Sequence, residues 1–201
     1  MDLFNQTDET YNLLPKDGNA LYHGFIFSRE EANSLFDTLM KSIAWRNDEV
    51  VMYGKHIVTK RKVAWYGDNL EGYSYPNVIK DALPFTDELN TVKKKIEEIT
   101  GEKYNACLLN LYHDGSESLS WHNDNEPCFK KHAAIASVSI GATRKFAFKH
   151  IATKEVISLI LESGSLLVMK DETQSHWLHS LPSTTKVTKP RINLTFRTIV
   201  R

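Results

Sequence analysis

The chain of 201 residues has few cysteines, no long hydrophobic run and no net charge, and each shortage excludes a class of protein. Cys107 and Cys128 are too few for a disulfide framework and form no CxxC pair, so we expect reduced structural thiols. No stretch of 18 or more apolar residues occurs, and the opening MDLFNQTDET lacks the basic and apolar parts of a signal peptide. We therefore expect a soluble, intracellular protein with no membrane partner.

Positive and negative charges balance, with 25 lysines and arginines against 25 acidic residues. A chain of zero net charge has no general attraction for nucleic acid, so any such binding needs a local basic surface. Internal repeats and low-complexity segments are also missing. Because 41% of the residues are hydrophobic, the chain can bury one core. We expect a polar arm over residues 1–20 and a single domain over residues 21–201.

Two amphipathic helices are expected in the first half of the chain. Ser28 and Glu31 have the spacing of a capping box, and apolar residues follow at helical intervals as far as Ile43. A second periodic segment covers about residues 86–100 and ends at Gly101, a typical C-terminal stop.

Short strands dominate from residue 105 onward. Their apolar runs are separated by turns at Gly115, Gly141 and Gly164. Such a series is typical of a sandwich or jelly roll, so we expect a mainly β chain with added helices, within the α+β class. The expected strands are NACLLNLY, SLSWH, AIASVSI, RKFAFKH, VISLIL, SLLVMK and RINLTFRTIV.

The stretch WHNDNEP places a histidine and a carboxylate two residues apart, at His122 and Asp124. In an extended segment both side chains point to the same face, where they could clamp a metal ion. The pair alone is a weak signal, because a solvated turn or a His–Asp hydrogen bond explains most such pairs. A metal centre needs a third ligand, and the downstream candidates are His132, His150, His176 and His179.

The segment RINLTFR, residues 191–197, alternates polar and apolar side chains. As a strand it presents two arginines on one face and an apolar set on the other. Polar groups on facing strands of a barrel usually line a ligand pocket, and arginines suit a small dicarboxylate. The alternative is an edge strand whose arginines face water. The polar set on this strand and on its neighbour comprises Asn110, Tyr112, Arg191, Asn193, Thr195 and Arg197.

The order HxD, then a distal histidine, then RxNxTFR resembles the AlkB branch of the iron(II)- and 2-oxoglutarate-dependent dioxygenases over about residues 45–200. The resemblance implies a double-stranded β-helix in which His122, Asp124 and His179 bind iron(II) and leave positions open for 2-oxoglutarate and molecular oxygen. His179 is favoured over His176 because the distal histidine of the family lies in a segment like WLHSLP. By the same resemblance, the 2-oxoglutarate shell comprises Asn110, Tyr112, Arg191, Asn193, Thr195 and Arg197.

A basic and aromatic segment, residues 50–76, precedes the expected jelly roll. Read from the residues alone, it is a half-buried hairpin with solvated lysines. The resemblance instead implies a nucleotide-recognition lid, so that residues 21–104 hold the helices and the lid and residues 105–201 the catalytic core. The residues assigned to the substrate are Tyr53, Gly54 and Lys55 in a finger hairpin, Arg61 at a phosphate, Tyr73 and Tyr75 around the base, and Asn125 and Glu126 beside the metal aspartate.

The resemblance implies an oxidative demethylase that hydroxylates the alkyl carbon of an N-alkylated base and releases it as aldehyde. Asn125 stands where duplex-repairing relatives often carry an acid, so base preference stays open, as does the choice among duplex DNA, single-stranded DNA and RNA. We expect a monomer that acts on nucleic acid, most of all alkylated DNA. The alternatives are an RNA demethylase, a protein hydroxylase of the same superfamily and a non-catalytic jelly roll.

Overall fold

The computed structural model describes residues 11–52, 55–68 and 82–200. The helices among them are α1 (Arg29–Ser42), α2 (Asp87–Thr100) and the short α3 (Thr173–His176). The strands are β1 (Asn19–Phe25), β2 (Arg46–Met52), β3 (Lys55–Gly67), β4 (Ala106–Tyr112), β5 (Leu119–His122), β6 (Ile135–Gly141), β7 (Arg144–His150), β8 (Val156–Leu161), β9 (Ser165–Lys170), β10 (Trp177–Leu181) and β11 (Arg191–Arg197).

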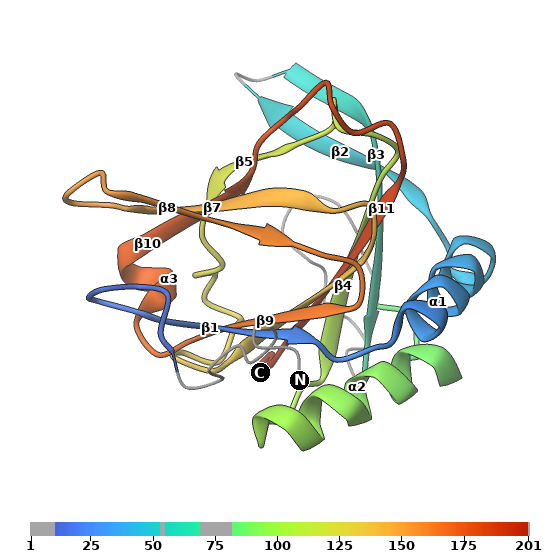
Figure 1. Ribbon diagram of the computed structural model, residues 1–201, viewed down its shortest axis with the longest axis horizontal. Coiled ribbons are helices and arrows are strands. Elements are labelled where there is room, and N and C mark those ends of the chain that lie inside the picture. Colours follow the sequence, from blue (N-terminus) through green and yellow to red (C-terminus); the bar gives the residue numbers. More distant parts are fainter. Residues whose placement is uncertain (1–10, 53–54, 69–81, 201) are drawn as a thin grey trace, which may run out of the picture.

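Two antiparallel sheets make up the body of the protein (Figure 1). The larger sheet has the strand order β1-β9-β6-β11-β4-β3-β2, and the smaller has the order β5-β10-β7-β8. Each strand expected from residue 105 onward is present, although the last ends at Arg197 and not at residue 200. The arrangement confirms the mainly β jelly roll.

The strict alternation of β11 decides which of its side chains face the interior. Ile192, Leu194 and Phe196 belong to the apolar cluster that α1 and α2 share with the outer face of the larger sheet. The intervening polar residues therefore face the space between the sheets. A second apolar cluster, which includes Phe146 and Phe148, fills part of that space.

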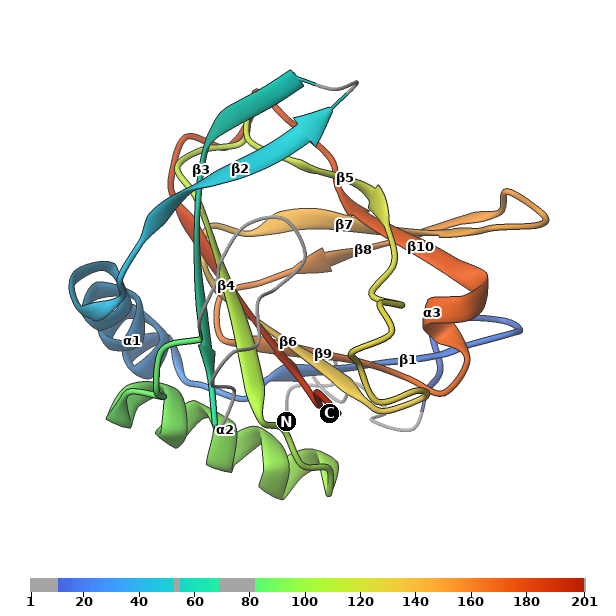
Figure 2. The same cartoon turned by 180° about the vertical axis from the view of Figure 1, so that it is seen from behind.

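Both long helices follow their expected bounds and cover one side of the larger sheet (Figures 1 and 2). At the start of α1, Ser28 accepts a hydrogen bond from the Glu31 amide, and the Glu31 carboxylate accepts one from the Ser28 amide. α2 ends at Gly101, whose φ of 70° is the left-handed conformation that glycine adopts without strain. The capping box and the glycine stop are both confirmed.

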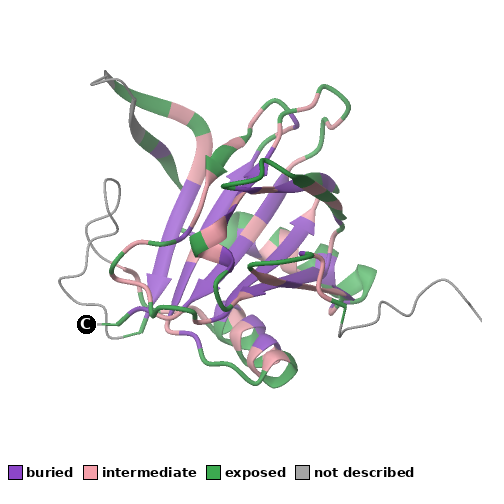
Figure 3. Cartoon of the chain, turned by 90° about the vertical axis from the view of Figure 1, so that its left-hand side faces the viewer, coloured by how far each residue is buried: buried purple, intermediate pink, exposed green. Residues whose placement is uncertain are grey.

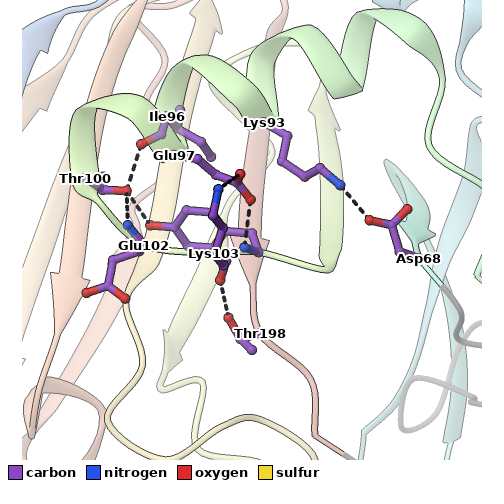
Figure 4. A network of polar contacts seen from close by, with 9 residues as sticks. Asp68, Lys93, Ile96, Glu97, Thr100, Glu102, Lys103 and Thr198 are labelled. Atoms are coloured by element: carbon purple, nitrogen blue, oxygen red, sulfur yellow. Dashed lines mark hydrogen bonds and ion pairs between the residues drawn. The ribbon is translucent and has the colours of Figure 1, made fainter.

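A polar network fixes α2 to the strand ends beneath it (Figure 4). Lys93 Nζ lies 2.5 Å from Asp68 Oδ2, just after β3, and Lys103 Nζ lies 2.7 Å from Glu97 Oε2. The Thr198 hydroxyl donates to the Lys103 carbonyl at 2.6 Å. The helix is thereby tied to segments that follow β3 and β11.

The end of the expected N-terminal arm packs against the body. Leu14 is only 2% exposed, and the indole Nε1 of Trp177 donates to the Lys16 carbonyl at 3.0 Å. β1 begins at Asn19 and pairs with β9. Part of residues 11–20 thus packs against the sheets, whereas residues 1–10 lie outside the described residues, and the expected boundary at residue 20 stays a prediction.

Two strands were not expected: β1 and β10. β2 pairs with β3 to form the hairpin that the basic segment was thought to contain. Figure 3 shows that buried residues concentrate along the strands of both sheets. Of the described hairpin residues, Glu49, His56, Ile57 and Val58 are exposed. Among the described residues, no helix has the length and apolar character needed to cross a membrane.

Candidate metal and cosubstrate site

Pairing between β5 and β10 brings two histidines together from positions far apart in the chain. His122 at the end of β5 is the direct register partner of His179 in β10, and their ring centroids are 4.2 Å apart. Asp124 follows on the strap, the segment of residues 123–134 between β5 and β6. One possible ligand atom from each of His122, Asp124 and His179 lies within 4.8 Å of the others.

Both histidines can offer a ring nitrogen to this site. His122 Nδ1 lies 2.8 Å from the Ser120 carbonyl, which can only accept, so Nδ1 is the donor there and Nε2 is the ring nitrogen left for a metal. Burial and the neighbouring His122, opposed by Asp124, together lower the pKa of His179 to about 3. Among the described residues, the buried Nδ1 of His179 has no hydrogen-bond partner.

Asp124 is the charged ligand of the three, and it is 5% exposed. Burial alone would raise its pKa, but Arg197, His179 and His122 together outweigh that effect and hold the pKa at about 2. Arg197 donates to Oδ2 from Nη2 at 2.7 Å and from Nε at 3.1 Å. One carboxylate oxygen is thus held by Arg197, which leaves Oδ1 available to a metal. The predicted contact of Arg197 with 2-oxoglutarate stays a prediction.

Arg191 is a buried cation that calls for an anionic ligand. Its side chain lies at the start of β11, is 2% exposed and donates to Ser139 Oγ at 2.9 Å. Burial lowers its pKa to about 10, yet the group remains charged at neutral pH. No carboxylate among the described residues pairs with it, and its Nε has no hydrogen-bond partner there. A carboxylate of 2-oxoglutarate would supply the missing negative charge and accept a hydrogen bond from Nε.

The rest of the predicted cosubstrate shell lines the same interior face. Tyr112 lies beneath Arg191, with the guanidinium carbon 5.5 Å from its ring centroid. Asn193 is the register partner of Asn110, and its amide donates to Ser137 Oγ at 2.9 Å. Thr195 donates to the Asn193 side-chain oxygen at 3.1 Å. The structure therefore brings the six predicted residues onto β4 and β11.

Two serines of β6 were missed by the sequence reasoning. Ser137 and Ser139 are buried and face Thr195 and Asn193 across the β6–β11 pairing. Their signal was present in ASVSIG, where small polar residues alternate with apolar ones at strand spacing. They supply the hydroxyls that position Asn193 and Arg191 in the pocket.

Arg144 is a buried arginine that the sequence reasoning did not single out, and its role differs from that of Arg191. It is 2% exposed and lies 5.9 Å from the Tyr112 ring centroid. Its terminal nitrogens donate to the carbonyls of Asp114, Glu117 and Pro182 at 2.9–3.1 Å. These bonds tie two loops at one end of the barrel, so Arg144 serves the fold and Arg191 remains the cation available to a ligand.

The expected phosphate contact of Arg61 does not agree with its position. Arg61 on β3 forms an ion pair with Asp48 on β2, and the two side chains are only 12% and 7% exposed. Its guanidinium carbon lies 5.7 Å from the Tyr112 ring centroid. Arg61 thus connects the β2–β3 hairpin to the floor of the cosubstrate pocket, and its basic character gave no signal of the buried Asp48 that pairs with it.

The other predicted substrate residues are only partly described. Asn125 is exposed and Glu126 half-buried on the strap, where both line a cavity of about 200 Å³ beside Asp124. Lys55 begins β3. Tyr53, Gly54, Tyr73 and Tyr75 lie outside the described residues.

The remaining histidines of the described chain are not brought to the metal ligands. His176 is half-buried on α3, 3.7 Å from Glu172, and its ring stacks on His150. His132 contacts the Asp171 carbonyl through Nδ1 at 3.2 Å. Of the candidate third ligands, the site therefore takes His179.

Comparison with known proteins agrees with this geometry. The family described as the 2OG-Fe(II) oxygenase superfamily matches residues 18–197. The chain is 34% identical to DNA oxidative demethylase ALKBH2 of Bos taurus, over 95% of the chain and 73% of that protein. It is 33% identical to alpha-ketoglutarate-dependent dioxygenase alkB homolog 3 of Homo sapiens, over 90% of the chain and 65% of that protein.

A solved structure supports the fold independently of close sequence identity. The structure of OsALKBH1 matches with a TM-score of 0.62 and 16% identity, over 92% of this chain and 99% of that one. At this identity the match concerns the fold alone. Together with the sequence relatives and the triad, it leads to one assignment: the chain belongs to the 2OG-Fe(II) oxygenase superfamily, in its AlkB branch.

Proposed function

We propose that this protein is an oxidative demethylase of N-alkylated bases in nucleic acid, with DNA as its main substrate. Family membership makes it an iron(II)- and 2-oxoglutarate-dependent dioxygenase. The proposal rests on the meeting of His122, Asp124 and His179. It also rests on the buried Arg191, whose hydrogen-bond partner among the described residues is a serine and not a carboxylate. The relatives named DNA oxidative demethylase ALKBH2 support the choice of substrate.

The residues of the site fit the cofactors of the family. Two imidazoles and one carboxylate are a donor set typical of iron(II) oxygenases, and they leave coordination positions open. When bound, iron with 2-oxoglutarate and oxygen supplies the oxidising power that converts an N-alkyl carbon into a hydroxyalkyl group, which then leaves as aldehyde. The protein itself holds and orients the reacting groups.

Each side chain has a separate task in this proposal. His122 and His179 offer ring nitrogens as metal ligands, and Asp124 offers the oxygen that Arg197 does not hold. Arg191 binds the distal carboxylate of 2-oxoglutarate by a two-point contact and so fixes its direction in the pocket. Phe146 stacks on His179 with ring centroids 5.6 Å apart and excludes water from one side of the metal site.

The substrate side of the proposal depends on the lid and the strap. Tyr73 and Tyr75 would stack on an extruded base, and Tyr53, Gly54 and Lys55 would engage the nucleic acid at the hairpin tip. Glu126 and Asn125, next to Asp124 in the chain, would read the edge of the base. Arg61 is left out, because its ion pair with Asp48 turns it toward the pocket floor.

The direct test is demethylation of synthetic oligonucleotides. The protein is incubated with iron(II), 2-oxoglutarate and strands that carry one N-methylated base, as duplex DNA, single-stranded DNA and RNA. Formaldehyde release and loss of the methyl group should depend on both cofactors and should be absent from Asp124→Ala. Stronger turnover of RNA than of either DNA would replace the DNA assignment. Consumption of 2-oxoglutarate with no demethylation of any strand would contradict the proposed substrate class.

A further inference from the structure

Asp124 is the one metal ligand that does not lie on a strand. His122 and His179 are held in register by the β5–β10 pairing, whereas Asp124 lies on the strap after β5 has ended. The far part of the strap is fixed by backbone bonds to the C-terminal segment, such as Lys130 N to the Thr198 carbonyl at 2.8 Å. The position of Asp124 must therefore depend on contacts closer to it.

Gln174 of α3 supplies two such contacts. Its side-chain Oε1 accepts a hydrogen bond from the Asp124 amide at 2.9 Å, and its backbone carbonyl accepts one from Asn123 Nδ2 at 2.8 Å. The side-chain amide of Gln174 donates to Met169 Sδ at 3.7 Å, which leaves Oε1 directed at the strap. We call these bonds between Asn123, Asp124 and Gln174 the clasp.

The helix that provides the clasp is itself firmly placed. Thr173 is 1% exposed, its hydroxyl donates to the Lys170 carbonyl at 2.6 Å, and the same oxygen accepts from the Asn19 amide at 2.8 Å. Trp177, the first residue of β10, is fully buried. α3 leads directly into β10, so Gln174 lies five positions before His179.

We propose that Gln174 is a positioning residue that sets Asp124 at the right distance from the two histidines, a role that rests on the iron site of the proposed function. One side of the clasp belongs to the segment that carries His179, and the other to the segment that carries Asp124. The clasp thus joins the two parts of the triad through groups that do not touch the metal. Partners of this kind typically change metal affinity by about 10- to 100-fold when they are removed.

The experiment measures binding of cobalt(II), a coloured probe for divalent metal sites, to the full chain by anaerobic titration of its visible absorption. Gln174→Leu keeps the size of the side chain but removes the acceptor for the Asp124 amide. We expect it to weaken cobalt affinity by about tenfold or more and to alter the absorption spectrum of the bound ion. Gln174→Glu keeps an acceptor at the same reach and should recover most of the affinity. Ser175→Ala on the same helix is the control and should match the parent protein.

A second variant tests the other half of the clasp without changing α3. Asn123→Ala removes the donor to the Gln174 carbonyl and should also weaken cobalt binding, while the melting temperature of the metal-free protein stays close to that of the parent. Parent-like cobalt affinity in both Gln174→Leu and Asn123→Ala would overturn the inference, even if the parent demethylates DNA. Weakened cobalt binding in both variants would support it even if no oligonucleotide is demethylated, so the two proposals can fail separately.

Discussion

His176 and His179 are three residues apart, yet their side chains have different surroundings. His179 is 5% exposed and faces His122, whereas His176 lies on α3 beside Glu172. His179→Ala should therefore weaken cobalt(II) or iron(II) binding by more than about 100-fold, because two remaining ligands hold a labile ion poorly. His176→Ala should retain parental affinity. Calorimetric titration of both variants checks this, and loss of metal in the His176 variant alone would contradict the ligand choice.

Arg191 and Arg144 form a matched pair of buried arginines near Tyr112. Arg144 is satisfied by loop carbonyls, whereas Arg191 has only Ser139 as a hydrogen-bond partner among the described residues. Arg191→Lys should raise the dissociation constant of 2-oxoglutarate by about 10- to 100-fold, since a contact with a charged group contributes roughly 1.5–3 kcal/mol. Arg144→Lys should lower the melting temperature and leave 2-oxoglutarate affinity unchanged. Equal 2-oxoglutarate binding by the parent and Arg191→Lys would exclude the pocket assignment.

The β2–β3 hairpin carries a buried ion pair, which we expect to affect stability and not nucleic-acid binding. Asp48→Asn leaves the Arg61 charge without its carboxylate and should lower the free energy of unfolding by about 3 kcal/mol in a denaturant titration. Arg61→Met, which removes the charge that needs a partner, should lower the free energy of unfolding by less than Asp48→Asn does. The two variants should show the same dependence of DNA binding on salt as the parent.

Lys55 lies on the same hairpin, and unlike Arg61 it is expected to affect the salt dependence of DNA binding. If it contacts a phosphate, Lys55→Ala should reduce the slope of log affinity against log salt concentration by about one, measured by fluorescence anisotropy with a labelled duplex. A reduced slope for Arg61→Met and an unchanged one for Lys55→Ala would reverse the two assignments.

Elements with a strong local pattern could be predicted from the sequence, and those defined by distant partners could not. β11 alternates polar and apolar residues throughout, so both its faces were foreseeable. The strand WLHSL of β10 is short, and α3 ends just before it, so the local pattern gave no separate signal. The clasp joins Gln174 to Asp124 and Asn123, which precede it by 50 and 51 positions in the chain. The ion pair between Arg61 and Asp48 depends on the register of the β2–β3 hairpin. Such contacts exist only once the sheets have formed.

At the scale of the whole molecule, the site joins two sheets. Arg191 belongs to the larger sheet, while His122 and His179 belong to the smaller one. By resemblance to the family, 2-oxoglutarate contacts the metal at one end and an arginine at the other, so that the two ligands together would link the sheets. Manganese(II) and 2-oxoglutarate added together should then raise the melting temperature by more than the sum of their separate effects.

This cooperative stabilisation should be lost when the larger sheet loses Arg191 or the smaller sheet loses His179. In Arg191→Lys, manganese should still raise the melting temperature, but 2-oxoglutarate should add little, because its distal carboxylate has lost the planar two-point partner. In His179→Ala, neither ligand should stabilise the protein beyond a small 2-oxoglutarate effect at Arg191. Differential scanning fluorimetry on the three proteins, with each ligand alone and with both, measures the coupling directly. Additive shifts in the parent would mean that the two ligands bind independently, and that the sheets are held together by the apolar cluster between them without help from the site.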